Sequence, residues 1–171
     1  MRAARVVTGA RAAIAFAFFA LLFAPSIAQA EHFAIQLTVS SAADKQMSFS
    51  DTCSPQRPQG FKPRPEFHVK AGEEIVLQYF LSSNFPHDAI KNVTIRYYIV
   101  PEAKAGQDAV PSRDGAIIQG HFVMDFKPET GKVGLRERLK IEKKGTYLVR
   151  VESENSATDH EHFSAIDLVV E

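Results

Sequence analysis

The chain has 171 residues, with 20 Lys and Arg against 20 Asp and Glu, one cysteine and no tryptophan. Basic residues do not outnumber acidic ones, so the chain lacks the excess positive charge that neutralises phosphates. This argues against a nucleic-acid partner. The sequence contains no HExxH, Gly-x-Ser-x-Gly or phosphate-binding loop motif, so we predict no enzymatic activity. The lone Cys53 rules out an internal disulfide and leaves a buried thiol, an intermolecular bridge or a metal thiolate as alternatives.

Residues 1–30 have the three-part pattern of a secretory signal peptide. Arginines precede an apolar run of 13 residues, Ala12 to Ala24, and Ala28-Gln29-Ala30 supplies the small residues of a cleavage site. The run is shorter than the roughly 20 residues of a membrane span, although an uncleaved anchor is the alternative. Cleavage would leave Glu31 as the first residue of a secreted or periplasmic domain. This mature chain of 141 residues has lost three arginines and carries a net charge of −3.

The mature chain, residues 31–171, alternates apolar and polar residues over many short stretches, which is typical of half-buried strands. The alternating segments run through 33–39, 75–81, 93–99, 118–126, 133–141, 147–151 and 162–170, with shorter pieces at 46–50 and 66–70. Turn residues separate them, and no helical period occurs. We therefore predict a single all-β domain, an antiparallel sandwich of seven to nine strands, with a barrel as the competing architecture.

The phase of the alternation predicts which side chains enter the core. Seven of them share the buried phase of their strands: Leu77, Tyr79, Ile95, Tyr97, Leu139, Tyr147 and Val149. The last strand changes phase, since Phe163 and Ala165 are apolar at odd positions and Ile166 is apolar at an even one. This predicts a β-bulge near Ser164–Ile166. Residues 52–65, rich in proline, and 101–115 are predicted to be connections.

Two segments resemble parts of bacterial immunoglobulin-like domains. Gly145-Thr146-Tyr147-Leu148-Val149-Arg150-Val151 is similar to the penultimate strand of that fold. The resemblance implies that the Tyr147 hydroxyl ties down the preceding corner. Lys70-Ala71-Gly72-Glu73-Glu74-Ile75 is similar to the entry of an early strand. The predicted sandwich is accordingly immunoglobulin-like, a fold class that does not specify a function.

The C-terminal hairpin also resembles the periplasmic copper-resistance family of small immunoglobulin-like copper carriers. The matching residues are Gly145, Tyr147, Val149, Val151, Ser153, Asp159, His160 and Phe163. That family also uses a histidine at the start of the mature chain, and here His32 would be the second mature residue. The resemblance implies copper binding by these histidines.

The densest polar constellation is Asp159-His160-Glu161-His162. Two histidines at i and i+2 on a strand share a face, and imidazole suits Cu²⁺ and Zn²⁺. His121 and His32 are the candidates to complete the ligand shell. The alternative is that His160 and His162 form a solvated strand start beside a turn.

Two functions follow as hypotheses. The first is a non-enzymatic binding module for a protein or surface partner, with no cofactor. The second is a copper or zinc carrier using His160, His162, His121 and His32. A basic stripe on one strand face, Arg136, Arg138 and Lys140, is interpreted as solvation, diluted by Glu137 and Glu142.

Overall fold

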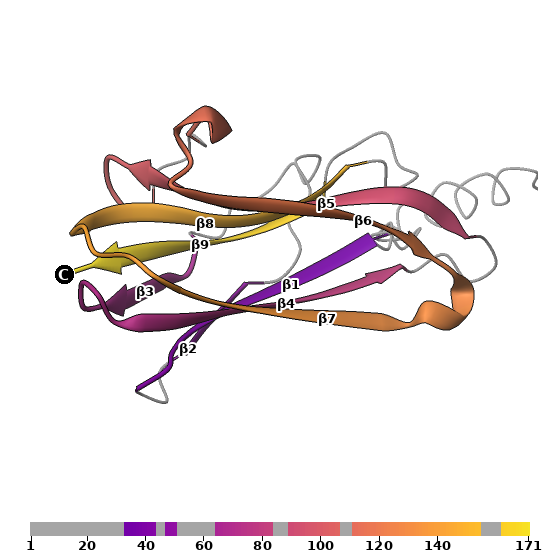
Figure 1. Ribbon diagram of the computed structural model, residues 1–171, viewed down its shortest axis with the longest axis horizontal. Helices are drawn as coiled ribbons and strands as arrows, with labels where there is room; N and C mark the ends of the chain where they lie inside the picture. Colours follow the sequence, from indigo (N-terminus) through magenta and orange to yellow (C-terminus); the bar gives the residue numbers. More distant parts are fainter. Residues whose placement is uncertain (1–32, 44–46, 51–63, 84–88, 107–110, 155–161) are drawn as a thin grey trace, which may run out of the picture. The chain divides into compact units, whose positions relative to one another are not determined.

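The computed structural model describes residues 33–43, 47–50, 64–83, 89–106, 111–154 and 162–171. These ranges contain nine strands and two single-turn 3-10 helices, and the strands lie in two layers (Figure 1). The elements are β1 (Phe33–Ser41), β2 (Met47–Ser50), β3 (Glu66–Val69), β4 (Glu74–Ser83), β5 (Ile90–Glu102), η1 (Arg113–Gly115), β6 (Ile118–Phe126), η2 (Pro128–Thr130), β7 (Lys132–Lys140), β8 (Gly145–Glu154) and β9 (His162–Val170). The predicted signal peptide, Cys53 and most of the predicted connection 52–65 lie outside the described residues.

The strands pair into two sheets. The first has the order β2-β1-β4-β7 and the second the order β3-β9-β8-β5-β6. The series β1-β4-β7 and β9-β8-β5-β6 reproduce the A-B-E and G-F-C-C′ orders of immunoglobulin domains. The prediction of an all-β, immunoglobulin-like sandwich is confirmed. One pairing differs from the antiparallel expectation, because β3 runs parallel to β9.

The core lies between the sheets and takes the predicted phase of each strand. Leu77, Tyr79, Ile95, Tyr147 and Val149 are all buried. Buried side chains of both sheets belong to one core cluster.

Two of the seven predicted core residues, Tyr97 and Leu139, are only half-buried. Leu139 lies on β7, an end strand that has a neighbour on one side only. Tyr97 lies across Gly120 of the other end strand, β6, where an added Cβ would come within 2.5 Å of the ring. The alternation assigned the correct face to both residues. It could not show that they lie on the side of the sandwich where the sheets end in β6 and β7, which we call the open side.

The corner before β8 has the predicted tyrosine tie. The Tyr147 hydroxyl donates a hydrogen bond to the carbonyl oxygen of Lys143 at 2.7 Å, and the ring is buried. This is the tyrosine-corner device of immunoglobulin-like domains. The resemblance in the penultimate strand is therefore matched by the structure of the corner.

The predicted β-bulge in β9 is wrong. The register with β8 runs without a shift from Gly145 opposite Val170 to Ser153 opposite His162. Phe163 and Ala165 are apolar because the outer side of β9 is also covered. They belong with a second small cluster that contains Tyr98, Val100 and Leu148. The apparent change of phase comes from His162 and Ser164, two polar residues in the core phase.

Candidate binding faces

His162 lies in the core at the start of β9. Its side chain is fully buried, and its ring centroid is 6.1 Å from that of Phe33. The neighbouring Ser153 hydroxyl donates to the His162 carbonyl oxygen at 3.5 Å. The expectation of a solvated strand start is wrong for this residue, because its strand phase is that of Ile166 and Leu168.

His121 lies on the opposite face of the same sheet. It is exposed on β6 and stands opposite Arg96 of β5, on the solvent side. Strands β8 and β5 separate β9 from β6, and strand spacing places the two strands about 14 Å apart. His121 and His162 therefore cannot ligate one ion, which corrects the four-histidine site. His32 and His160 lie outside the described residues, so their part in a copper or zinc site stays a prediction.

The outer face of the five-stranded sheet holds a network of paired charges. Glu152 is buried and accepts hydrogen bonds from the Tyr98 hydroxyl at 3.0 Å, from Arg150 Nε at 2.8 Å and from Arg113 Nη1 at 2.9 Å. The Arg150 guanidinium lies 4.0 Å from the centroid of the Phe163 ring. These interactions fix both arginines, and the Arg113 contact docks η1 onto the sheet.

Glu154 extends this network toward solvent. Arg96 holds its two oxygens with Nε at 2.8 Å and Nη2 at 3.1 Å, and Arg113 adds a contact of 3.3 Å. The hydrogen bond from Arg96 lowers the pKa of the Glu154 carboxyl, and Arg113 contributes in the same direction. The carboxylate therefore stays ionised under acidic conditions in which a free glutamate would begin to protonate.

A second set of buried charges lies near the other end of this face. Asp167 is fully buried and accepts from Arg64 Nε and from the Gly106 amide, each at 2.5 Å. Arg64 Nη2 also reaches Glu102 at 2.9 Å. One guanidinium thus serves two buried carboxylates and connects the segment before β3 with the connection after β5.

Two hollows open near these charges. One, of about 460 Å³, lies beside the tyrosine corner, and its buried acid Glu102 is held by Arg64. The other, of about 330 Å³, is polar and is lined by Arg96, Tyr98, Arg113 and His121 among others. The two arginines that line the second hollow, Arg96 and Arg113, are bound to Glu154 and Glu152. Among the described residues, no group of three His, Cys, Asp or Glu is placed to hold a metal ion.

The outer face of the four-stranded sheet is different, because its charges stand in solvent. Four basic side chains point outward along β7: Lys132, Arg136, Arg138 and Lys140. Arg138 pairs with Glu74 at 2.8 Å, and both side chains are substantially exposed. Glu74 is the acidic residue on this face within the described strands.

Glu137 does not dilute this basic stripe. It points to the inner side of β7, opposite the buried Leu77. There, burial raises the pKa of Tyr79 above its ordinary value, and the charges of Glu137 and Tyr97 add to the shift. Burial and Glu137 likewise raise the pKa of Tyr97. The interpretation of the stripe as diluted is therefore wrong with respect to Glu137.

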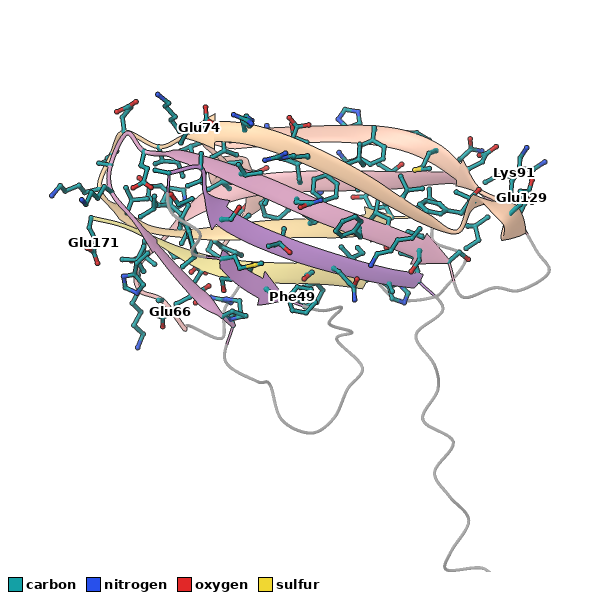
Figure 2. All side chains as sticks on the ribbon, turned by 90° about the horizontal axis from the view of Figure 1, so that it is seen from below. Phe49, Glu66, Glu74, Lys91, Glu129 and Glu171 are labelled. Atoms are coloured by element: carbon teal, nitrogen blue, oxygen red, sulfur yellow. The ribbon has the colours of Figure 1, made fainter. Side chains whose placement is uncertain are left out.

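Apolar side chains adjoin the basic stripe. The Phe80 ring fills the space above Gly134, where an added Cβ would lie 2.8 Å from a ring carbon. Lys132 Nζ stands 4.5 Å from the centre of that ring and donates to Gln36 Oε1 at 2.5 Å. On β2, Met47 is 65% exposed and Phe49 is 52% exposed, and Phe49 projects away from the sandwich (Figure 2).

Comparison with known proteins gives no family. No protein-family model matches the chain, and no curated protein matches it in sequence. The proposed likeness to copper carriers therefore has no family match behind it. No helix in the described part of the chain is long and apolar enough to cross a membrane.

Three solved structures are weakly similar to the chain. A family 123 glycoside hydrolase from Clostridium perfringens has 11% identity and a TM-score of 0.43, and the match covers 64% of this chain and 23% of that one. A chitin binding domain from Burkholderia pseudomallei has 17% identity and a TM-score of 0.41, covering 62% and 57%. A lytic polysaccharide monooxygenase from Streptomyces lividans has 13% identity and a TM-score of 0.32, covering 68% and 64%. The matched part is less than two thirds of each of these proteins, and neither a ligand nor an activity follows from such distant likeness.

Sequence reasoning missed the most distinctive feature of the outer faces. Arg150, Glu152 and Asp167 stand at outward positions of their strands, where polar residues are ordinarily solvated. Two features of the sequence could have revealed their burial. One is the presence of both arginines and acids at outward positions, and the other is the apolar Phe163 and Ala165 at outward positions of β9. Those apolar residues indicate that this face is covered.

Proposed function

We propose that the chain is an exported, non-enzymatic binding module that docks an acidic protein surface on the outer face of its four-stranded sheet. The observation that carries the proposal is the row of four solvated basic side chains along β7, beside Phe80 and the exposed Met47 and Phe49 of β2. We call this surface the basic face.

The charge of the basic face supports an acidic partner. Its β7 side chains carry four positive charges, offset on the described strands by Glu74, whereas the predicted mature domain is net negative. A patch whose sign opposes that of its own domain attracts a partner of the opposite charge and orients it during association.

The apolar side chains of the basic face support a protein as that partner. Phe, Met and Arg are enriched in protein–protein interfaces, where aromatic side chains next to charged residues add apolar contact area. The buried ionisable groups on the other sheet, Glu152 and Asp167, are bound by arginines inside the fold, which favours a structural role for them over a catalytic one.

Export rests on the predicted signal peptide. Mass spectrometry of secreted protein should give Glu31 as the first residue. Recovery of the chain with Met1 intact in the membrane fraction would contradict both export and the predicted cleavage site.

The docking proposal is tested with poly-L-glutamate as a surrogate for an acidic protein surface and with alginate, a polyuronate, as a polysaccharide probe. We expect the protein to bind poly-L-glutamate, and the variant Arg136→Glu/Arg138→Glu to bind at least tenfold more weakly. The matched control is Lys143→Glu/Lys144→Glu, which makes the same change in net charge at an exposed turn outside the basic face.

The outcomes separate the alternatives. Equal losses in both double variants would mean that only net charge matters and would overturn the docking site. Binding of alginate without poly-L-glutamate would overturn the protein partner. Binding of the two probes by both variants as by the wild type would remove the basic face from the function.

A further inference from the structure

We infer that the protein forms a two-fold dimer in which the β6 edges of two copies pair antiparallel about Val123. The inference is independent of the basic face. It rests on the contrast between the two end strands on the open side of the sandwich, β6 and β7, and on the residues that one register of β6 brings together.

The β7 edge is protected against strand pairing. It carries Lys132, Arg136, Arg138 and Lys140 on its outer side and the inward-pointing acid Glu137. Edge lysines and inward-pointing charges are the features by which natural sheets prevent edge-to-edge contact.

The β6 edge lacks this protection. Its sequence, IQGHFVMDF, includes one acid, Asp125, and no lysine or arginine. As the end strand of its sheet, it directs half of its backbone N–H and C=O groups away from β5. It is also nine residues long and pairs with β5 in unbroken register from Val93 opposite Met124 to Ile99 opposite Ile118. The edge is therefore suited to accept another strand.

Apolar side chains on β6 are incompletely covered. Val123 is 56% exposed on the outer side, and Phe122 and Met124 are half-buried on the inner side. A strand added along β6 would cover all three, because cross-strand neighbours lie about 5 Å apart.

Self-pairing about Val123 gives a complementary set of neighbours. In an antiparallel pair, residues directly opposite each other lie on the same face of the sheet. The inner faces of the two copies therefore match only when the two-fold axis passes between the two copies of one residue. With the axis at Val123, each His121 faces Asp125 of the other copy, and each Phe122 faces the other copy's Met124. The outer face then gains two pairs of imidazole with carboxylate around a Val–Val contact, and the inner face gains two contacts of sulfur with an aromatic ring.

The neighbouring registers are poorer. An axis at Phe122 would place His121 opposite Val123 and leave Asp125 opposite Gln119. An axis at Met124 would place Val123 opposite Asp125 and bring His121 against Lys127. Asp125 Oδ1 accepts from the backbone amide of Asn92 in β5 at 2.9 Å, so the contact with His121 of the other copy would use the other carboxylate oxygen, Oδ2. The charges of β6 thus favour one register and a second copy of this chain as the occupant.

The first test is the mass of the protein in solution. Analytical ultracentrifugation should show a reversible dimer, and Val123→Lys should raise the dimer dissociation constant at least tenfold because two like charges would face each other across the axis. Ile117→Lys, which makes the same change at an exposed apolar residue just outside β6, should leave the dimer intact. A wild-type protein that stays monomeric, or a Val123→Lys variant that dimerises normally, would overturn the proposal.

The second test fixes the register. In a Cys53→Ser background, Val123→Cys should form a disulfide-linked dimer on mild oxidation, because residues on the axis have Cα atoms about 4.5–5.5 Å apart. Asp125→Cys should not, since the two copies of residue 125 would lie about 14 Å apart along the strands. Cross-linking through residue 125 and not through residue 123 would show that the register is wrong.

A charge exchange provides the third readout. His121→Asp should weaken the dimer, because it sets two carboxylates against each other, and the exchange His121→Asp/Asp125→His should restore it. Failure of the double variant to recover, with its fold intact by circular dichroism, would contradict the pairing of these residues.

Discussion

The two outer faces of this sandwich use the same residue types for different purposes. On the five-stranded sheet, Arg64, Arg150, Glu152 and Asp167 are wholly or largely withdrawn from water and bound to one another. On the four-stranded sheet, Arg136, Arg138 and Lys140 remain in solvent, with Glu74 as a partner for one of them. Where a connection and its side chains cover a sheet face, the charges on that face stabilise the fold. On an uncovered face the charges stay available to a partner.

The comparison predicts the largest loss of stability for Arg64→Met. The substitution would leave Asp167 and Glu102 buried without the guanidinium that they share. Breaking a buried pair in this way costs about 3–5 kcal/mol. Arg138→Met also removes the arginine partner of a carboxylate, but at an exposed site, and should cost about 0–1 kcal/mol. Urea denaturation of both variants measures the contrast, and equal losses would mean that the two faces do not differ energetically.

Glu152→Gln should have the next largest effect. The amide keeps the shape of the side chain but removes the charge that Tyr98, Arg113 and the buried Arg150 bind. Hydrogen bonds to charged groups contribute about 1.5–3 kcal/mol, so we expect a loss of about 2 kcal/mol in the free energy of unfolding. The matched change on the basic face, Glu74→Gln, should stay below about 0.5 kcal/mol. A Glu152→Gln protein as stable as the wild type would show that the network is not a structural element.

The pairing of Glu154 should appear as a dependence of stability on pH. Its folded pKa lies below the ordinary value of 4.5, so its contribution is present above that value and is lost as the pH falls through the lowered pKa. Because the side chain is partly exposed, solvent screening keeps the contribution below about 1 kcal/mol. The difference in unfolding free energy between wild type and Glu154→Gln should therefore be present at neutral pH and shrink in acid. A difference that stays constant over this range would contradict the role of Arg96.

The smallest effect on stability is expected on the basic face. Arg136→Glu/Arg138→Glu should change the free energy of unfolding by no more than about 0.5 kcal/mol at Arg136 and by about 0–1 kcal/mol at Arg138, which loses its pair with Glu74, because both side chains are exposed. The same variant is the one expected to lose binding of poly-L-glutamate. Thermal unfolding measured beside the binding assay separates the two properties, and a strongly destabilised variant would show that these arginines serve the fold.

Much of the fold was predictable from local patterns. The period-two alternation identified seven of the nine described strands and indicated β2 and β3 as shorter pieces. The corner at Tyr147 was implied by the resemblance of its Gly-x-Tyr pattern to immunoglobulin-like domains. Both signals depend on neighbouring residues alone. The error at β9 arose where the pattern was ambiguous: His162 and Ser164 are polar but lie in the core phase. The alternation of apolar and polar residues does not reveal a polar side chain that is buried in the core.

The candidate sites were less predictable, since they depend on strand order. The predicted ligand set joined His121 to His162, yet these two residues lie on opposite faces of one sheet, on strands separated by two others. The solvation of the basic stripe was correctly anticipated. The alternation along β7 also places Glu137 on the opposite side from the stripe.

The all-β class, most strand positions and the inner face of most strands follow from the sequence, because each depends on spacing along the chain. The folded structure was needed to show which charges are buried, which strands end the sheets and which residues meet across them. Those properties depend on contacts between segments distant in sequence, as when Arg64 reaches Asp167 across 103 residues. The proposed basic face and the proposed β6 dimer both belong to this second group, because each depends on what the neighbouring strands and connections leave uncovered.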